Sequence, residues 1–432
     1  MSLTLRNVKK TCLTEQKRHD IHFTNMVSIN LIGIYVGIFL ALILGVSLGH
    51  LLPPGKFEYG PGLNQHLLTW DGCWYRDIAE NGYSWNPRTG MRSQGYQNVA
   101  FFPLYSLIER SLMFLTQGRS WITTIAPGVV FGLWSVAAFD RLAQKLVKDR
   151  QCSLNASALY AFWPASCFFF MGYPTGLINL CTIYAVDAYL DRKFTRSGIW
   201  CGIGSAAAPT IVFVAFGLCL HRGIRWLLHS RTFKEGLQIF AFGLLSVSGL
   251  LAFMIYLWYK FGNPIVFVAA QAAWAVPDDV IPTETLLTHV ELMFFPPWYG
   301  LSFYKTYVFS LKLIRGHTDI SVYDLSILNN YLQYNMNVIA TLIAIYSLII
   351  SRKFRSLFAT SLFVIIGYIW FFASTYNYFI NGIRLLYPAL IIFIAGGIFH
   401  SKHRYLGMAI LTTSFALTCI EISLVWAGYV VI

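Results

Sequence analysis

Charged residues are scarce in this sequence: they make up 12% of its 432 residues, whereas 56% of the residues are hydrophobic. Soluble domains carry about a quarter charged residues, and a soluble chain of this length would need more charge to cover its surface. The apolar residues also come in blocks of about 20, the length at which a helix crosses the hydrocarbon core of a bilayer. These features exclude a soluble fold and predict an all-α, polytopic membrane protein.

Metal-binding and disulfide patterns are also missing, although eight cysteines are present. The cysteines are scattered, several lie inside apolar runs, and the sequence contains neither a CxxC pair nor a Cys/His cluster. Neither a zinc site nor a disulfide framework is supported, so we expect the thiols to pack as small apolar groups. We expect no metal and no cofactor.

Internal repeats, low-complexity tracts and separate soluble domains are absent as well. The first apolar block, 27–48, is too long for a signal peptide and follows a basic segment. We therefore expect a cytoplasmic tail at 1–26 and a single transmembrane domain at 27–432, with outward loops at about 49–98 and 260–332. About ten to twelve transmembrane helices are predicted, from the block at 27–48 and from later apolar blocks at about 99–117, 121–142, 155–172, 175–190, 197–220, 237–259, 334–350, 356–374, 385–399 and 405–428.

The net charge of +13 comes from 32 Lys+Arg against 19 Asp+Glu, and it is typical of the positive-inside bias of membrane proteins. No basic soluble face suggests nucleic-acid binding. If the N-terminus is cytoplasmic and every block crosses, three basic clusters fall in the cytoplasm, as the rule requires: 221–234, 352–355 and 402–404.

Two further clusters, 141–150 and 191–196, would then lie outside, against the rule. If block 99–117 does not cross, both clusters lie in the cytoplasm. The chain must then cross the membrane one additional time before His221 to keep the cluster 221–234 in the cytoplasm. Both alternatives place the 49–98 loop on the outer side. The sequence leaves this choice open.

Acidic residues are rare, yet three of them lie within ten positions of the first outward loop: Asp71, Asp77 and Glu80. If 71–80 is helical, Asp77 and Glu80 share a face, whereas Asp71 begins the first turn and could cap the helix. The neighbouring aromatic residues, among them Trp70, Trp74 and Tyr75, predict either an interfacial helix anchored in the headgroup region or a surface for sugar rings, which carry apolar C–H patches.

The loop sequence resembles the signature of the PIG-V family, polytopic glycosyltransferases of the GT-C superfamily whose eukaryotic members add the second mannose in glycosylphosphatidylinositol anchor synthesis. The resemblance runs from about residue 70 to the end of the chain. Its first motif is fairly specific, and the later ones gain weight because they occur in order. The matching segments are 70–83, 101–105, 261–274, 384–389 and 426–430.

Three positions depart from the family pattern. Thr175 stands where the family has an acid at the mouth of a middle helix, the element at 206–210 lacks the usual Arg, and Trp74 replaces a His of the eukaryotic members. The first two departures raise the alternative of a catalytically inactive, PIG-V-like subunit.

The resemblance implies an inverting glycosyltransferase. Such an enzyme moves a sugar, mannose by the family name, from a polyprenyl-phosphate carrier to a lipid or glycan acceptor at the outer or luminal membrane face. We expect Asp71 to be the general base, since a carboxylate can take the acceptor proton, and Arg384 to bind the carrier phosphate, which suits a guanidinium. The other expected substrate-binding residues are Trp70, Tyr75, Arg76, Asp77, Glu80, Tyr83, Gln271 and Trp274.

A transporter or lipid flippase is the alternative from another class, because many spans and few charges suit it too. Four acids inside or at the ends of apolar blocks also need an account: Glu109, Asp140, Asp187 and Asp191. The expected location is a bacterial inner membrane, or the endoplasmic reticulum membrane if the chain is eukaryotic; Asn155 heads its one glycosylation sequon.

Overall fold

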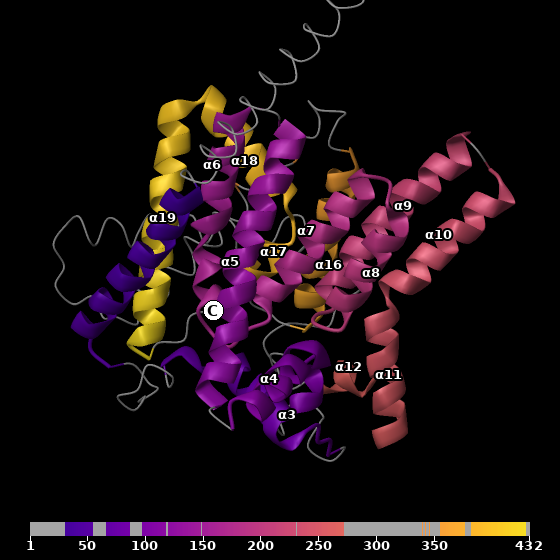
Figure 1. The fold of residues 1–432 in the computed structure, drawn as a ribbon, viewed down its shortest axis with the longest axis horizontal. Helices are drawn as coiled ribbons and strands as arrows, with labels where there is room; N and C mark the ends of the chain where they lie inside the picture. Colours follow the sequence, from indigo (N-terminus) through magenta and orange to yellow (C-terminus); the bar gives the residue numbers. More distant parts are fainter. Residues whose placement is uncertain are drawn as a thin grey trace, which may run out of the picture.

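The computed structural model describes residues 31–54, 66–86, 97–117, 120–147, 149–229, 231–271, 339, 342, 345, 355–375 and 382–428. All regular secondary structure in these ranges is helical (Figure 1). The prediction of an all-α fold is confirmed.

Four described helices are long and apolar enough to cross a membrane: Leu31–Leu51, Ile122–Val147 within α5 (Ser120–Val147), α9 (Thr210–His229) and α19 (Arg404–Trp426). A fifth span exists if α10 (Phe233–Ser246) and α11 (Ser248–Phe261), bent by 54° at their junction, count as one. The protein is therefore an integral membrane protein. The predicted block 334–350 lies almost entirely outside the described residues.

Shorter helices complete the described part of the bundle. Near the N-terminal half these are α3 (Asp71–Asn81), η1 (Asn98–Ala100), α4 (Pro103–Leu115), α6 (Arg150–Ala161), η2 (Pro164–Phe169), α7 (Thr175–Leu190) and α8 (Phe194–Ser205). The later ones are α12 (Val266–Gln271), α16 (Arg355–Thr375), α17 (Gly382–Leu386) and α18 (Ile391–Lys402).

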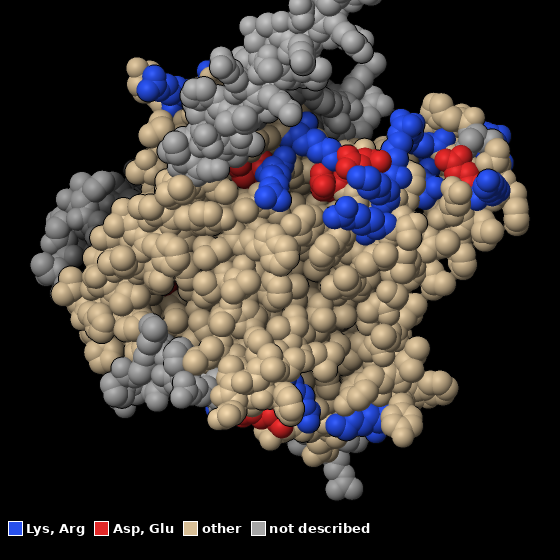
Figure 2. Space-filling model, in the orientation of Figure 1, with Lys and Arg blue, Asp and Glu red and all other residues tan. Residues whose placement is uncertain are grey.

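Charged side chains gather at two opposite edges of the molecule, with an uncharged belt between them (Figure 2). We call the upper one the basic edge; it carries the described Lys and Arg residues of 141–147, 150, 191–196, 221–234 and 402–404. The lower one, which carries α3, is the α3 edge (Figure 1). By the positive-inside rule, we propose that the basic edge faces the cytoplasm.

The two clusters that disobey the rule in the sequence share this edge with the others. Lys145 at the end of α5 forms ion pairs with Asp187, at 2.7 Å, and with Asp191, and so joins α5 to the end of α7. The hydroxyl of Tyr189 lies 2.6 Å from Nδ1 of His221 on α9. The ends of α5 and α7 therefore lie together, beside the middle of α9.

A change of direction inside one predicted block explains this arrangement. Block 197–220 is not one span, as the sequence suggests, but two antiparallel helices, since Arg222 of α9 lies over the ring of Phe194 at the start of α8, 3.8 Å from its centroid. The chain turns at 206–209, which includes Pro209. Block 99–117 contains only the 13-residue α4, about 20 Å long, which packs against α3 at the α3 edge and does not reach the basic edge (Figure 1).

Three acids of the apolar blocks form ion pairs at the basic edge. Asp140 accepts from Arg150, at 3.0 Å, and from Ser157, at 2.9 Å. Asp187 and Asp191 share Lys145. Boundary ion pairs between helix ends thus account for three of the four acids.

The two predicted outward loops meet at the α3 edge. Lys260, at the end of α11, donates to the carbonyl oxygen of Tyr83 just after α3, at 2.6 Å. Phe102 packs edge-on against Phe267 of α12, with ring centroids 5.6 Å apart. The start of the second loop therefore lies against the first loop, where both could contribute to one site.

An aromatic stack in the core fixes the end of α17. The Tyr160 ring lies between Phe139 and Tyr387, with centroids 4.4 and 4.8 Å away, and the Tyr387 hydroxyl donates to the Tyr160 carbonyl oxygen. Tyr387 is fully buried and follows α17 directly. The core thereby fixes the short helix that carries Arg384.

Candidate functional site

The first turn of α3 is fixed against the segment that precedes α7. Trp70 has φ 48° and ψ −114°, a conformation that is rare for a non-glycine residue and is seen where surrounding structure enforces it. The backbone N–H of Asp71 donates to the hydroxyl of Tyr173 at 3.2 Å, and that hydroxyl donates to the Thr69 carbonyl oxygen at 3.3 Å. These bonds hold Asp71 at the head of the helix.

Gly72 allows this close approach. A Cβ at this position would lie 3.3 Å from the carbonyl oxygen of Gly172, tighter than an ordinary contact. Together with the Tyr173 bonds, this contact aligns the start of α3 with the chain between η2 and α7.

Asp71 and Arg384, which are 313 positions apart, form an ion pair. Arg384 Nη1 lies 2.8 Å from Asp71 Oδ2, and the side chains keep 18% and 26% of their surface exposed. The guanidinium carbon lies 5.1 Å from the ring centroids of both Phe168 and Tyr173. Among the described residues, Asp71 Oδ1 accepts no hydrogen bond. The structure thus brings together the two residues expected to act as base and phosphate ligand.

The alternative that Asp71 caps α3 is wrong. Trp70 occupies the cap position, without a side-chain capping bond, and Asp71 is the first helical residue. Its carboxylate points instead to Arg384. A partly exposed acid paired with a cation from the far end of the chain has a role in tertiary structure or chemistry rather than in the local turn.

The other charged residues of α3 bind elsewhere. Arg76 and Glu80 form a half-exposed i, i+4 pair at 2.7 Å, a kind of contact that stabilises a helix little. Asp77 accepts from Asn81 at 2.9 Å and from Asn98 at 2.8 Å, which ties η1 to α3. No described contact brings these three side chains to Asp71.

Tyr75 and Tyr83 have packing roles. Tyr75 is buried with its ring edge-on to Phe101 and Tyr105, at 5.3 and 5.4 Å, and burial raises the pKa of its hydroxyl, an effect that the nearby Asp71 charge increases. The Tyr83 hydroxyl donates to the carbonyl oxygen of Phe101 at 2.8 Å. Both hold α3 against the segment leading into α4.

Three of the remaining sequence candidates contribute less to the described geometry. The indole N–H of Trp70 is buried and has no hydrogen-bond partner among the described residues. Gln271 ends α12 at the α3 edge, but only its backbone is described, and Trp274 lies outside the described residues. Thr175, the first departure from the family pattern, is buried. It follows Tyr173, which contacts the start of α3, by two residues.

Glu109 is a buried acid whose role does not follow from the sequence. It lies on α4, which packs against α3, and it is fully buried. Burial raises the pKa of its carboxyl to about 9, although the Thr124 hydroxyl and Arg76 oppose the shift. The group is therefore protonated at neutral pH. The sequence shows only that this acid lies inside an apolar block. It cannot show which helix packs over the side chain.

Comparison with known proteins gives a family match over most of the chain. Residues 58–352 match the family model described as Mannosyltransferase (PIG-V). That range includes Asp71 but ends before Arg384. A curated relative, GPI mannosyltransferase 2 of Drosophila melanogaster, is 33% identical over 163 residues, which are 35% of this chain and 33% of the relative. The chain therefore aligns with about a third of the length of that relative.

Solved structures of an oligosaccharyltransferase from Archaeoglobus fulgidus also match this chain at low sequence identity. The apo form matches with a TM-score of 0.48 at 13% identity, over 92% of this chain and 56% of that chain. A complex of that archaeal enzyme with an inhibitory peptide and a dolichol-phosphate matches with a TM-score of 0.44 at 13% identity, over the same shares of the two chains.

Proposed function

The chain belongs to the mannosyltransferase (PIG-V) family, and from that premise we propose that it is an inverting mannosyltransferase that uses a polyprenyl-phosphate mannose donor. The observation that carries the proposal is the ion pair of Asp71 and Arg384 at the head of α3. It combines an acid and a phosphate-binding cation, the two groups that the reaction requires, at one end of the uncharged belt.

In the proposed reaction, Asp71 is the general base. The acceptor hydroxyl oxygen attacks the anomeric carbon of the mannosyl donor, Asp71 Oδ1 takes the hydroxyl proton, and the bond from the anomeric carbon to the phosphate oxygen breaks. A positioned carboxylate can supply this proton transfer. The pairing of Oδ2 with Arg384 supports the assignment, since it orients the carboxylate and leaves Oδ1 as the acceptor of the proton.

Arg384 is proposed to hold the charge of the leaving polyprenyl phosphate. Its guanidinium makes one hydrogen bond to Asp71 through Nη1, and a guanidinium has further N–H groups in a fork that fits phosphate. Charge develops on the phosphate as the sugar leaves, so a cation already in place stabilises the transition state. The polyprenyl chain would lie along the uncharged belt between the two edges.

The remaining expected residues are proposed to complete the site around the pair. Trp70 begins the turn and could stack on a sugar ring, and Gln271 and Trp274 could contact the acceptor from the second loop. Arg76, Asp77, Glu80, Tyr75 and Tyr83 would then support the shape of the site, because their described contacts lie within α3 and its neighbours.

The acceptor is proposed to be a lipid or a glycan at the membrane face opposite the basic edge. For the membrane itself we keep the expectation of a bacterial inner membrane, with the endoplasmic reticulum as the eukaryotic alternative. No described observation favours the flippase alternative.

The test is transfer of labelled mannose from polyprenyl-phosphate mannose to a set of lipid and glycan acceptors by purified protein. We expect the wild type to transfer label and Asp71→Asn to lose about 10²–10⁴-fold in rate, the range for a removed general base. The matched control is Asp187→Asn, which removes an acid of similar exposure from an ion pair at the other edge. It should keep its activity.

Two results would oppose the proposal. Transfer by Asp71→Asn at the wild-type rate would exclude the general-base role. If the pair is only scaffolding, removing both charges in Asp71→Asn/Arg384→Gln should restore the activity lost in either single variant, because it leaves no buried unpaired charge. A catalytic pair predicts that the double variant stays inactive.

A further inference from the structure

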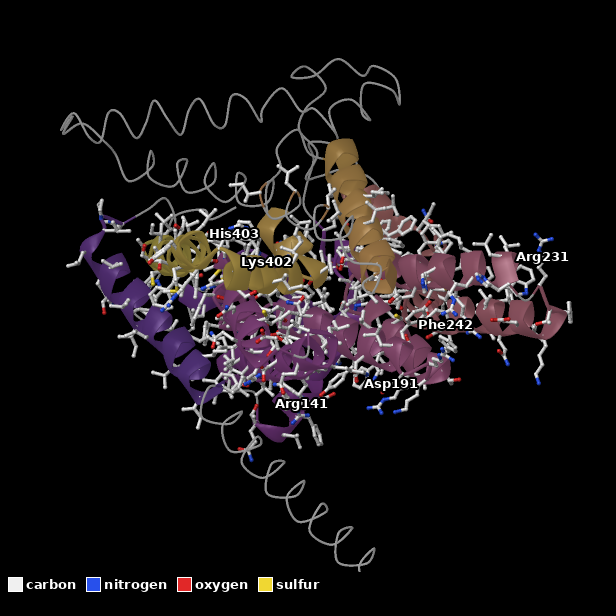
Figure 3. All side chains as sticks on the ribbon, turned by 90° about the horizontal axis from the view of Figure 1, so that it is seen from above. Arg141, Asp191, Arg231, Phe242, Lys402 and His403 are labelled. Atoms are coloured by element: carbon white, nitrogen blue, oxygen red, sulfur yellow. The ribbon has the colours of Figure 1, made fainter. Side chains whose placement is uncertain are left out.

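A cavity of about 560 Å³ lies at the basic edge, away from the Asp71 pair. The turn between α7 and α8, one side of α9 and one face of α10 enclose it. Figure 3 looks onto this edge: Phe242 marks α10, Asp191 marks the turn after α7, Arg141 lies apart from both, and Arg231 marks the tip of the α9–α10 hairpin. The volume is in the range of small-ligand sites.

Four cations and no acid line the cavity. The cations are Arg192, Lys193, Arg196 and Arg222. Lys193 is partly neutralised, since its Nζ lies 3.3 Å from Asp191 Oδ2. Arg192 and Arg196 form no ion pair with any described residue. The cavity therefore has an excess of positive charge.

Arg222 is the buried member of this group. Only 7% of its surface is exposed. Its Nη2 donates to Oε1 of Gln238 at 3.1 Å, and its guanidinium lies over the Phe194 ring. Its Nε is buried and has no hydrogen-bond partner among the described residues. A buried charge is costly unless it is paired, and the partners seen here are a neutral amide and a ring. Glu235 of α10 acts on Arg222 through space but does not line the cavity.

The walls change from polar to apolar along one helix face. On α10, Gln238, Phe242 and Leu245 follow the i, i+4, i+7 spacing of a single face. Gln238 binds Arg222 at the charged end, whereas Phe242 and Leu245 extend toward the uncharged belt. The N-terminus of α8, which begins at Phe194 without a side-chain cap, adds positive partial charge at the same end.

We propose that this cavity binds the phosphate headgroup of an anionic membrane lipid. The phosphate oxygens would accept from Arg222, Arg192 and Arg196, and an acyl chain would follow the apolar part of the α10 face. A soluble phosphate compound would use the same cations but would leave the apolar wall unoccupied, so the shape favours a lipid. This site is independent of the transfer reaction and lies at the opposite edge from Asp71.

The experiment uses full-length protein in nanodiscs of phosphatidylcholine with increasing fractions of phosphatidylglycerol, and separately with inorganic phosphate or glycerol phosphate. The readouts are the thermal unfolding midpoint and the lipid retained in native mass spectrometry. A ligand that binds only the folded state raises the midpoint. For the wild type we expect a rise with phosphatidylglycerol that neither soluble phosphate reproduces.

Arg222→Gln should need at least about ten times more phosphatidylglycerol for the same rise, because a charge-assisted hydrogen bond is lost. If this variant does not fold, Arg192→Gln/Arg196→Gln tests the same cavity at two exposed positions. The control is Arg141→Gln, an exposed cation of the same edge outside the cavity, which should respond like the wild type.

Three outcomes would overturn the proposal. Equal responses of Arg192→Gln/Arg196→Gln and Arg141→Gln would show that the lipid senses only the general charge of the edge. A full rise with inorganic phosphate or glycerol phosphate would replace the lipid by a soluble ligand. No rise with phosphatidylglycerol would exclude an anionic lipid at this site.

Discussion

At the residue scale, the neighbourhood of α3 contains two carboxyl groups in contrasting surroundings. Asp71 is partly exposed and paired with Arg384. Glu109 is fully buried beneath α3, and burial raises the pKa of its carboxyl to about 9. A carboxyl in an apolar environment favours its neutral form. Burial therefore keeps Glu109 protonated at neutral pH.

Replacing Glu109 with Gln should stabilise the protein increasingly as pH rises. The folded pKa, about 9, lies above the usual 4.5, so between these values the folded state holds a proton that the unfolded state has lost. Wild-type stability then falls with rising pH across this window, by up to about 1.4 kcal/mol per unit. Gln does not titrate.

The measurement is the thermal unfolding midpoint of both proteins between pH 5.5 and 8.5, with the exposed Glu80→Gln as a control that should follow the wild type. The unfolding midpoint of Glu109→Gln minus that of the wild type should become larger as the pH rises. Parallel pH profiles for the two proteins would show that Glu109 is not held neutral by burial.

At the scale of elements, close contacts between helices decide where the site forms. Gly176, in the first turn of α7, has so little space that a Cβ would lie 2.4 Å from the backbone nitrogen of Gly132 on α5. This contact holds α7 close to α5. It thereby also positions Tyr173, which binds the backbone of Asp71 at the start of α3. A side chain here would have to move one of the two helices.

Gly176→Ala should therefore lower stability by about 1–3 kcal/mol, the usual cost of overpacking. Gly223→Ala on α9 is the matched control, since nothing lies within 4 Å of its added Cβ. There alanine should be neutral or stabilising by up to about 1 kcal/mol. Thermal unfolding of the two variants measures the difference, and equal midpoints would mean that α5 and α7 do not pack closely at Gly176.

At the scale of the whole molecule, the two charged edges assign an orientation. Figure 2 shows the uncharged belt between them, and the basic clusters of α5, α7 and α9 share one edge. Membrane insertion with this edge in the cytoplasm satisfies the positive-inside rule for every cluster whose side chains are described. The apparent exceptions in the sequence come from counting block 99–117 as a crossing and from counting α8 and α9 as one crossing.

Cysteine labelling from the two sides of the membrane tests this orientation. Single cysteines at the exposed positions 141 and 196 should react with an impermeant maleimide from the cytoplasmic side only. A cysteine at position 80 on α3 should react from the opposite side only, in a background where the native cysteines are replaced. Labelling of 80 and 196 from the same side would contradict the arrangement.

Much of the fold and part of the candidate site could be predicted from the sequence. The blocks gave the helical membrane class, and the resemblance selected Asp71 and Arg384, which the structure pairs. It could not be predicted that Arg76 pairs with Glu80 or that Asp77 binds Asn98, because residue type alone does not show which partner a helix face meets. The basic cavity was not predicted either, since its walls come from the α7–α8 turn, α9 and α10, which only the packing of the helices brings together.

The sequence by itself determined that this protein folds in a membrane and which residue types could act at its surface. Both follow from the composition of the chain and the length of its apolar blocks, which are local properties. Only the tertiary structure decided the turn between α8 and α9, the common edge of the basic clusters and the meeting of Asp71 with Arg384. These depend on contacts between residues up to 313 positions apart, and such contacts are set by how the helices pack.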